Sequence, residues 1–194
     1  QVVAIKPDFA GMHNNLGNVY RELGELDAAL KSYKKAITIK PDFVEAFFNQ
    51  GITFQAQNQL GSAVKSYEKV ISIKPNLAEA HINLGTIFSE LKQFENAEES
   101  FRQTILLNPN YAGAHYNLGI TLKDLRKIDE AEDSFRNAII IDPDHAEAHN
   151  NLGNVMATQD KLEEAEDSFR NAIVIDPDYA EAHNNLGNVM ATQD

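Results

Sequence analysis

The sequence predicts an all-α protein built from repeated pairs of helices. All six prolines stand 34 residues apart, at positions 7, 41, 75, 109, 143 and 177. Six glycines follow the same period, and an alanine and an aromatic ring recur at fixed distances after each of the first five. A unit of this length accommodates two short helices with their turns, and proline ends the second helix because it lacks an N–H donor. Such units bury their apolar faces only by stacking into a solenoid.

Counting each repeat from the third residue after a proline divides the chain into one array of five complete and two partial repeats. The complete repeats are residues 10–43, 44–77, 78–111, 112–145 and 146–179. Residues 1–9 are interpreted as the end of a preceding second helix, and residues 180–194 as the first helix of a truncated sixth repeat. Neither end carries a polar capping helix. We therefore expect an excerpt from a longer array, with any catalytic domain outside it.

Three residue types at fixed positions predict how the two helices of a repeat pack. Glycine at position 8 costs about 1 kcal/mol relative to alanine inside a helix, so we expect it to admit the second helix. Position 20 is always alanine, which is small for the same reason, and position 24 is a ring expected to fill the space between helix pairs. The residues are Gly17, Gly51, Gly85, Gly119, Gly153 and Gly187; Ala29, Ala63, Ala97, Ala131 and Ala165; and Tyr33, Tyr67, Phe101, Phe135 and Phe169.

This pattern of Leu-Gly, then Ala-x3-aromatic, then Pro resembles the tetratricopeptide-repeat (TPR) signature along the whole chain. The resemblance implies a right-handed α-solenoid, or superhelix, of helix-turn-helix repeats with one continuous core and a concave inner surface. It also implies a protein-protein interaction scaffold that binds other polypeptides in that groove.

Composition narrows the classes of partner. The net charge is −12, and residues 94–194 hold seven Lys/Arg against twenty Asp/Glu, whereas residues 1–93 hold ten against nine. Such a field repels nucleic acid and favours a basic partner, unless the acids merely solvate outward helix faces. No apolar run approaches the about 20 residues needed to span a bilayer, so we expect no membrane partner. The absence of cysteine leaves the compartment open and only weakly favours the cytoplasm.

The six histidines raise the question of a metal site, because His145 and His149 stand four residues apart. Five of them occupy position 4, where the family places a large packing residue, and His145 shares position 34 with aromatic residues and leucine. We therefore interpret them as structural and predict no metal, no cofactor and no catalytic residue. The motifs of common hydrolases and nucleotide-binding enzymes are missing from the sequence, so we predict no enzymatic activity within these residues.

A row of asparagines provides the candidate binding site. Asparagine is a mediocre helix former, yet it occupies position 6 of every repeat, about 200° around the helix from position 4. We predict that the row faces the groove and bonds the backbone of an extended peptide, since an amide both donates and accepts. The alternative is that it tunes solubility or bonds within its own repeat. The row is Asn15, Asn49, Asn83, Asn117, Asn151 and Asn185.

Positions 5 and 9 next to this row are asparagine in repeat one and in the last two repeats, but mostly apolar in the centre. We predict that the central residues anchor apolar side chains of the ligand. Acidic residues outnumber basic ones at positions 2, 12 and 13, so the expected ligand is an extended neutral or basic polypeptide. The predicted anchors are Phe48, Ile52, Ile82, Tyr116 and Ile120.

A narrower resemblance rests on His-x-Asn-Leu-Gly followed by Pro-Asp-aromatic-Ala-Glu-Ala. It is similar to the repeat arrays of O-linked N-acetylglucosamine transferases and their bacterial relatives, in which an asparagine ladder lines the inner surface and holds substrate peptides. This implies the same role for the six asparagines and nothing catalytic. Two alternatives to a free-standing scaffold stay open: the substrate-recruiting region of a larger glycosyltransferase-type enzyme, and a scaffold that self-assembles end to end through open repeat ends.

Overall fold

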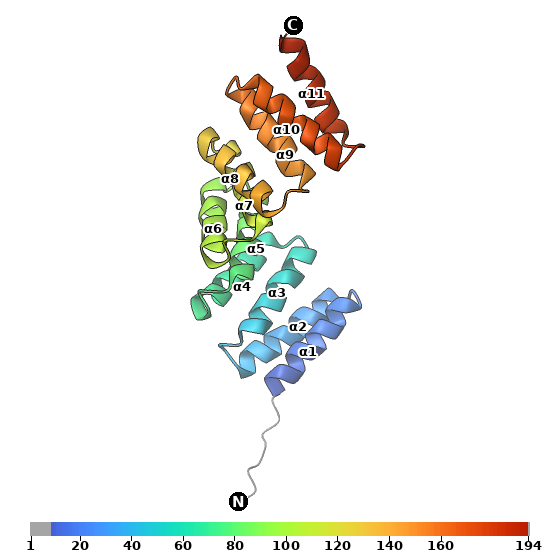
Figure 1. The fold of residues 1–194 in the computed structure, drawn as a ribbon. Helices are drawn as coiled ribbons and strands as arrows, with labels where there is room; N and C mark the ends of the chain where they lie inside the picture. Colours follow the sequence, from blue (N-terminus) through green and yellow to red (C-terminus); the bar gives the residue numbers. More distant parts are fainter. Residues whose placement is uncertain (1–8, 194) are drawn as a thin grey trace, which may run out of the picture. The chain divides into compact units, whose positions relative to one another are not determined.

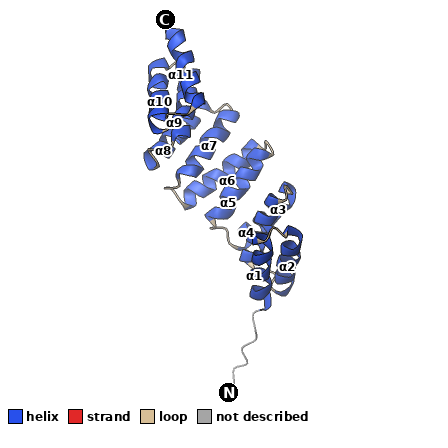
Figure 2. Ribbon diagram, turned by 90° about the vertical axis from the view of Figure 1, so that its right-hand side faces the viewer, coloured by secondary structure: helices blue, strands red, loops and turns tan. Residues whose placement is uncertain are grey.

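A computed structural model describes residues 9–193, and all of the regular structure among them is α-helical (Figures 1 and 2). The predicted fold class, an all-α solenoid of helix-turn-helix repeats, is confirmed. Of residues 1–9, which we interpreted as the end of a preceding second helix, residues 1–8 lie outside the described residues, and Phe9 is instead the first residue of α1. None of the described helices is long and apolar enough to cross a membrane.

The chain forms two compact units that meet within one helix: the first ends at Ile87 and the second begins at Phe88. The first unit holds four helices and the beginning of α5, and the second holds the end of α5 and six further helices (Figure 1). Their bounds are α1 Phe9–Glu22, α2 Leu26–Ile39, α3 Val44–Ala56, α4 Leu60–Ile73, α5 Ala78–Glu90, α6 Phe94–Leu107, α7 Ala112–Asp124, α8 Ile128–Ile141, α9 Ala146–Thr158, α10 Leu162–Ile175 and α11 Ala180–Gln193.

A helix glycine and a buried ring meet in the core of the helix pairs α1–α2, α3–α4, α7–α8 and α9–α10. A Cβ placed on Gly119 would lie 2.7 Å from Cε1 of Phe135, and one on Gly17 would lie 2.5 Å from Cε1 of Tyr33. Both rings are fully buried. The glycine therefore makes room for the ring of its own repeat, rather than for the alanine at position 20 as we expected, although that alanine is also buried.

One backbone conformation closes the turn between the two helices of every complete repeat. The residue at position 15 has a φ between 57° and 78°, in the left-handed region, in all five repeats. Glycine occupies it only once, and any other residue there costs roughly 1–2 kcal/mol. These residues are Gly24, Asn58, Lys92, Arg126 and Asp160.

The histidines at position 4 fasten the loops that join successive repeats. Nε2 of His149 lies 3.1 Å from the carbonyl oxygen of Pro143, and three other repeats show the same contact at 2.9–3.0 Å. From Pro41 onward, the residue before each proline is extended or close to it, as the proline ring requires. These histidines thus hold the proline loop against the following first helix.

Successive repeats contact each other mainly through the second helix of one repeat and the first helix of the next, such as α2 with α3 and α8 with α9. Their first helices also contact one another. In the first unit α1 contacts α3, and in the second unit α7 contacts α9 and α9 contacts α11. No comparable contact joins α2 to α4 or α8 to α10 within the described parts of the units. We call the surface of the first helices the inner face and that of the second helices the outer face.

Candidate peptide-binding face

The asparagine row lies on the first helices, where each side chain is exposed or half-buried. In two members, one hydrogen of the amide NH2 is already used inside the protein. Nδ2 of Asn49 donates to Oδ1 of Asn14 at 3.1 Å, and Nδ2 of Asn185 donates to Oδ1 of Asn150 at 3.0 Å. Each bond joins position 6 of one repeat to position 5 of the repeat before it.

Two of the asparagines at position 5, Asn14 and Asn150, are therefore buried acceptors rather than groove residues, whereas Asn184 is exposed. Asn14 is 7% exposed and Asn150 is fully buried. A buried amide is stable only when it is hydrogen-bonded, and the position-6 asparagine of the next repeat supplies that bond. This pairing has no signal in the sequence, because position 6 is asparagine in every repeat whatever residue stands at position 5, and we had expected Asn14 and Asn150 to line the groove.

Asn151 bonds to a tyrosine instead, because position 5 of the preceding repeat is Tyr116 and not asparagine. Its Nδ2 donates to the hydroxyl oxygen of Tyr116 at 3.3 Å and to the carbonyl oxygen of Glu147 at 3.0 Å, while Lys123 Nζ donates to its Oδ1 at 3.0 Å. By contrast, the side chains of Asn15 and Asn117 form no hydrogen bond with any other described residue. The row therefore contains amides that are hydrogen-bonded within the protein, which we call committed, and amides without a hydrogen bond to another described residue.

A cavity on the inner face of the first unit brings together two of the predicted residues, Phe48 and Asn49. It has a volume of about 310 Å³ and lies between α3, the loop after α4, and the start of α5. The Phe48 ring packs edge-on against buried Tyr67, with ring centroids 5.5 Å apart. The complete lining is Val44, Glu45, Phe48, Asn49, Lys74, Leu77 and Glu79.

In the second unit the equivalent positions carry aromatic and acidic side chains. The Tyr116 ring lies 4.6 Å from the ring of His145, whose Nδ1 is 3.1 Å from Oε2 of Glu147. Burial raises the pKa of the Tyr116 hydroxyl, and the carboxylates of Glu147 and Glu181 raise it further. The inner face is therefore electronegative here.

The remaining predicted anchors are half-buried on their first helices. Ile52 lies on α3, Ile82 on α5 and Ile120 on α7. Their exposed part adds apolar surface to the inner face of their own unit. The role of all eleven predicted residues in binding stays a prediction.

Comparisons with known proteins identify the family. A model described as TPR repeat matches residues 17–58 and 53–92, and models described as tetratricopeptide repeat match residues 78–111 and 116–180. The chain belongs to the tetratricopeptide-repeat family. A comparison with curated protein sequences gives no match.

Solved tetratricopeptide-repeat structures share this fold. The crystal structure of MamA is 25% identical with a TM-score of 0.83 over 90% of this chain and 95% of its own. YrrB, described as a TPR protein with an unusual peptide-binding site, is 26% identical with a TM-score of 0.83 over 92% of both chains. MamA from Desulfovibrio magneticus RS-1, at 20% identity and a TM-score of 0.82 over 91% of this chain and 99% of its own, shows the fold alone.

These matches give no support to the narrower resemblance to O-linked N-acetylglucosamine transferases, which stays a prediction from the sequence. The described residues belong to the helices and loops of the tetratricopeptide repeats. Among them there is no group of three or more histidine and acidic side chains that could hold a metal ion.

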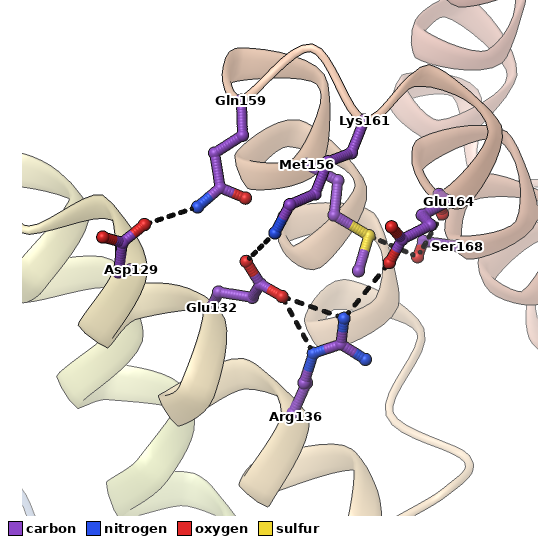
Figure 3. A network of polar contacts seen from close by, with 8 residues as sticks. All are labelled: Asp129, Glu132, Arg136, Met156, Gln159, Lys161, Glu164 and Ser168. Carbon is purple, nitrogen blue, oxygen red and sulfur yellow. Dashed lines mark hydrogen bonds and ion pairs between the residues drawn. The ribbon is translucent and has the colours of Figure 1, made fainter.

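The outer face of the second unit carries an ion-pair network that links successive tetratricopeptide repeats (Figure 3). Glu132 accepts from Lys161 Nζ at 2.8 Å and from Arg136 Nη2 at 2.9 Å. Arg136 also reaches Glu164 at 3.3 Å, so the network joins α8 to α10 and to the turn before it. Glu98, Arg102, Lys127 and Glu130 form the same arrangement one repeat earlier.

Proposed function

We propose that this chain is a non-catalytic protein-interaction module that binds an extended neutral or basic polypeptide along its inner face. The observation that carries the proposal is the cavity at Phe48 and Asn49, where an apolar floor meets an amide of the asparagine row. Membership of the tetratricopeptide-repeat family supports a role in protein interaction. The unusual peptide-binding site described for YrrB supports a peptide as the ligand.

The cavity provides a place for one apolar side chain of the ligand. Val44, Phe48 and Leu77 supply its apolar lining, and Phe48 is held in place by Tyr67. Burying an aliphatic side chain there contributes roughly 1.5–3 kcal/mol before ordering costs. In repeat 146–179 of the second unit, the residue equivalent to Phe48 is Asn150, which is fully buried and donates to Glu181 at 3.1 Å. We therefore place the apolar anchor in the first unit.

The asparagine row supplies acceptors for the backbone of the ligand. Because one of the two Nδ2 hydrogens of Asn49 is committed to Asn14, Oδ1 and the second Nδ2 hydrogen are left for a peptide. The committed asparagines therefore still accept from the ligand but have one hydrogen fewer to donate. Asn117, whose side chain has no hydrogen bond within the described residues, keeps both of its Nδ2 hydrogens.

The charges of the inner face favour particular residues in the ligand next to its apolar anchor residue. Glu45 and Glu79 line the cavity against a single cation, Lys74. Glu147 and Glu181 make the inner face of the second unit electronegative. A ligand with lysine or arginine near its apolar residue therefore fits better than an acidic one.

The test uses a phage-displayed library of random dodecapeptides selected against the full chain. We expect enrichment of an aliphatic or aromatic residue beside lysine or arginine. Affinity of the selected peptide, measured by calorimetry, should fall about tenfold for Asn49→Ala and for Glu45→Lys combined with Glu79→Lys, the loss of one charge-assisted or buried contact each.

Matched controls lie on the outer face. Asn137→Ala and Glu68→Lys alter the same residue types on exposed positions of α8 and α4 and should leave the affinity unchanged. Equal loss in the control variants, or selection of acidic peptides, would contradict the proposal.

A further inference from the structure

The outer face of the chain reverses its charge between the two units at the same repeat positions. In the first unit, positions 22 and 26 of both second helices are lysine. In the second unit, position 22 is always acidic and position 26 is an uncharged amide. The lysines are Lys31, Lys35, Lys65 and Lys69, and their counterparts are Glu99, Asp133 and Asp167 with Gln103, Asn137 and Asn171.

These charged side chains are exposed and have no partner among the residues that the structure describes. All four lysines and all three acids are classed as exposed, and none of them forms an ion pair or side-chain hydrogen bond with another described residue. The arginines nearby differ, because Arg102 and Arg136 are each bound to two glutamates. The lysines and the acids therefore remain available to a partner.

The acidic outer face has two cavities at the same positions of successive tetratricopeptide repeats. The first, of about 420 Å³, has Leu106 and Asp133 in its lining, and the second, of about 370 Å³, has Ile140 and Asp167 at the same repeat positions. Leu106 and Ile140 are 73% and 76% exposed, and Val174 continues this apolar row at 79%. The corresponding residues of the first unit are small and polar, Thr38 and Ser72.

A lysine side chain matches the chemistry of such a cavity. Its four-carbon stem covers apolar surface while the ammonium group stays at the polar rim. Here the stem would lie on Leu106 or Ile140, and the ammonium would reach Asp133 or Asp167. The two cavities are one repeat apart, so two lysines that fill them must also be one repeat apart. Lys31 and Lys65 have this spacing, and so do Lys35 and Lys69.

We propose that the lysine-bearing outer face of α2 and α4 binds the acidic cavities on the outer face of the second unit in another copy of this chain. Both rows follow the same 34-residue repeat, so contacts at one repeat align the contacts at the next. This interface is distinct from the inner face proposed for peptides and from association through open repeat ends.

Because the net charge is −12, a test can distinguish association through complementary faces from a simple effect of net charge. Overall repulsion between like-charged molecules opposes association, and only local complementarity favours it. Replacing acids with lysines lowers the overall repulsion but destroys the complementary face. The proposal and a simple net-charge effect therefore predict opposite outcomes for the same variant.

The experiment measures the mass of the full chain by sedimentation over a wide concentration range. In about 20 mM salt we expect a mass above the 21.6 kDa of the monomer. It should return to the monomer value in about 0.5 M salt, where the screening length falls to about 4 Å. A monomer at every concentration in low salt overturns the proposal, and so does a salt-resistant oligomer, which would indicate apolar association instead.

Charge exchange identifies the two faces. Lys31→Glu, Lys35→Glu, Lys65→Glu and Lys69→Glu in one variant, and Glu99→Lys, Asp133→Lys and Asp167→Lys in a second, should each weaken self-association at least about tenfold. The control Asp42→Lys, Asp144→Lys and Asp178→Lys changes the net charge as much as the second variant does, in exposed loops, and should not. Mixing the first two variants should restore association, and failure of the mixture to associate overturns the proposal.

Discussion

At the scale of single residues, the most informative position is the glycine that faces the buried ring. Gly153 and Gly187 sit in identical fifteen-residue segments, yet their surroundings differ. A Cβ on Gly153 would lie 2.6–2.8 Å from three atoms of Phe169, whereas one on Gly187 would meet no described atom within 4 Å. Two copies of one sequence thus place the same residue in a tight contact and in open space.

This difference predicts opposite effects for one substitution. Gly153→Ala gains about 1 kcal/mol of helix propensity but forces a buried ring to move, at a cost of about 1–3 kcal/mol. We therefore expect it to lower the free energy of unfolding by up to about 2 kcal/mol, measured by urea denaturation followed by circular dichroism. Gly187→Ala serves as the control and should leave that free energy unchanged or raise it; equal destabilisation by both would contradict the packing argument.

Residue periodicity predicted the helices and the buried ring, but not which atoms meet. Gly17 and Tyr33 were expected to be in the core, yet their direct contact depends on the distance between two helices, which the period does not contain. Asn14 was expected in the groove, and it is buried because Asn49 of the next repeat covers it and supplies its hydrogen bond. Contacts between repeats require the stacking geometry.

At the scale of helices, the outer-face network fastens α8 to the following repeat through Glu132 (Figure 3). The hydrogen bond from Lys161 is the main cause that lowers the pKa of Glu132; burial opposes it, and the bond from Arg136 adds to it. The folded protein thus holds this carboxylate charged to a lower pH than the unfolded chain does. Its stabilisation is complete above the ordinary value of 4.5 and is lost as pH falls through the lower folded pKa.

We expect Glu132→Gln to reduce the free energy of unfolding by about 1 kcal/mol at neutral pH, because the partly exposed partners lose one shared carboxylate. The difference from the natural chain should shrink as the pH falls below 4.5. Denaturation series at several pH values measure this. Glu163→Gln, at an exposed position of the same outer face, should show no such convergence; a Glu132→Gln penalty that grows on acidification would refute the assignment.

The turn between helices was only partly predictable. Gly24 marks the first turn in an obvious way, because glycine adopts positive φ freely. Lys92 and Arg126 hold the same left-handed conformation, and neither residue type indicates it. The helix pairing around them imposes the conformation and outweighs the local cost.

At the scale of the whole molecule, charge distinguishes the two units. The second helices of the second unit, α6, α8 and α10, carry eleven acidic residues and three arginines. Each of them has an acidic pair four residues apart, such as Asp129 with Asp133 and Glu163 with Asp167. Like charges at this spacing destabilise a helix. The first unit has such pairs as well, Lys31 with Lys35 and Lys65 with Lys69, but the three second helices of the second unit together carry the larger excess of one sign.

Salt should therefore stabilise the units unequally. Raising the ionic strength from about 20 mM to about 200 mM shortens the screening length from about 20 Å to about 7 Å. We expect slower amide hydrogen exchange in α8 and α10, with a smaller change in α2 and α4, measured by mass spectrometry on peptides from the full chain below the concentration of any association. Faster exchange in α8 and α10 would mean that the ion pairs outweigh the repulsion.

The bonds between Asn49 and Asn14, and between Asn185 and Asn150, also bear on the kinetics and entropy of recognition. Each fixes the rotamer of its inner-face amide during folding, so the cost of ordering that side chain falls on folding rather than on ligand capture. A rigid, preoriented row of acceptors would leave most of the entropic penalty to the incoming peptide. Affinity would then depend on how stiff and extended that peptide already is, and constrained ligands would have the advantage over flexible ones.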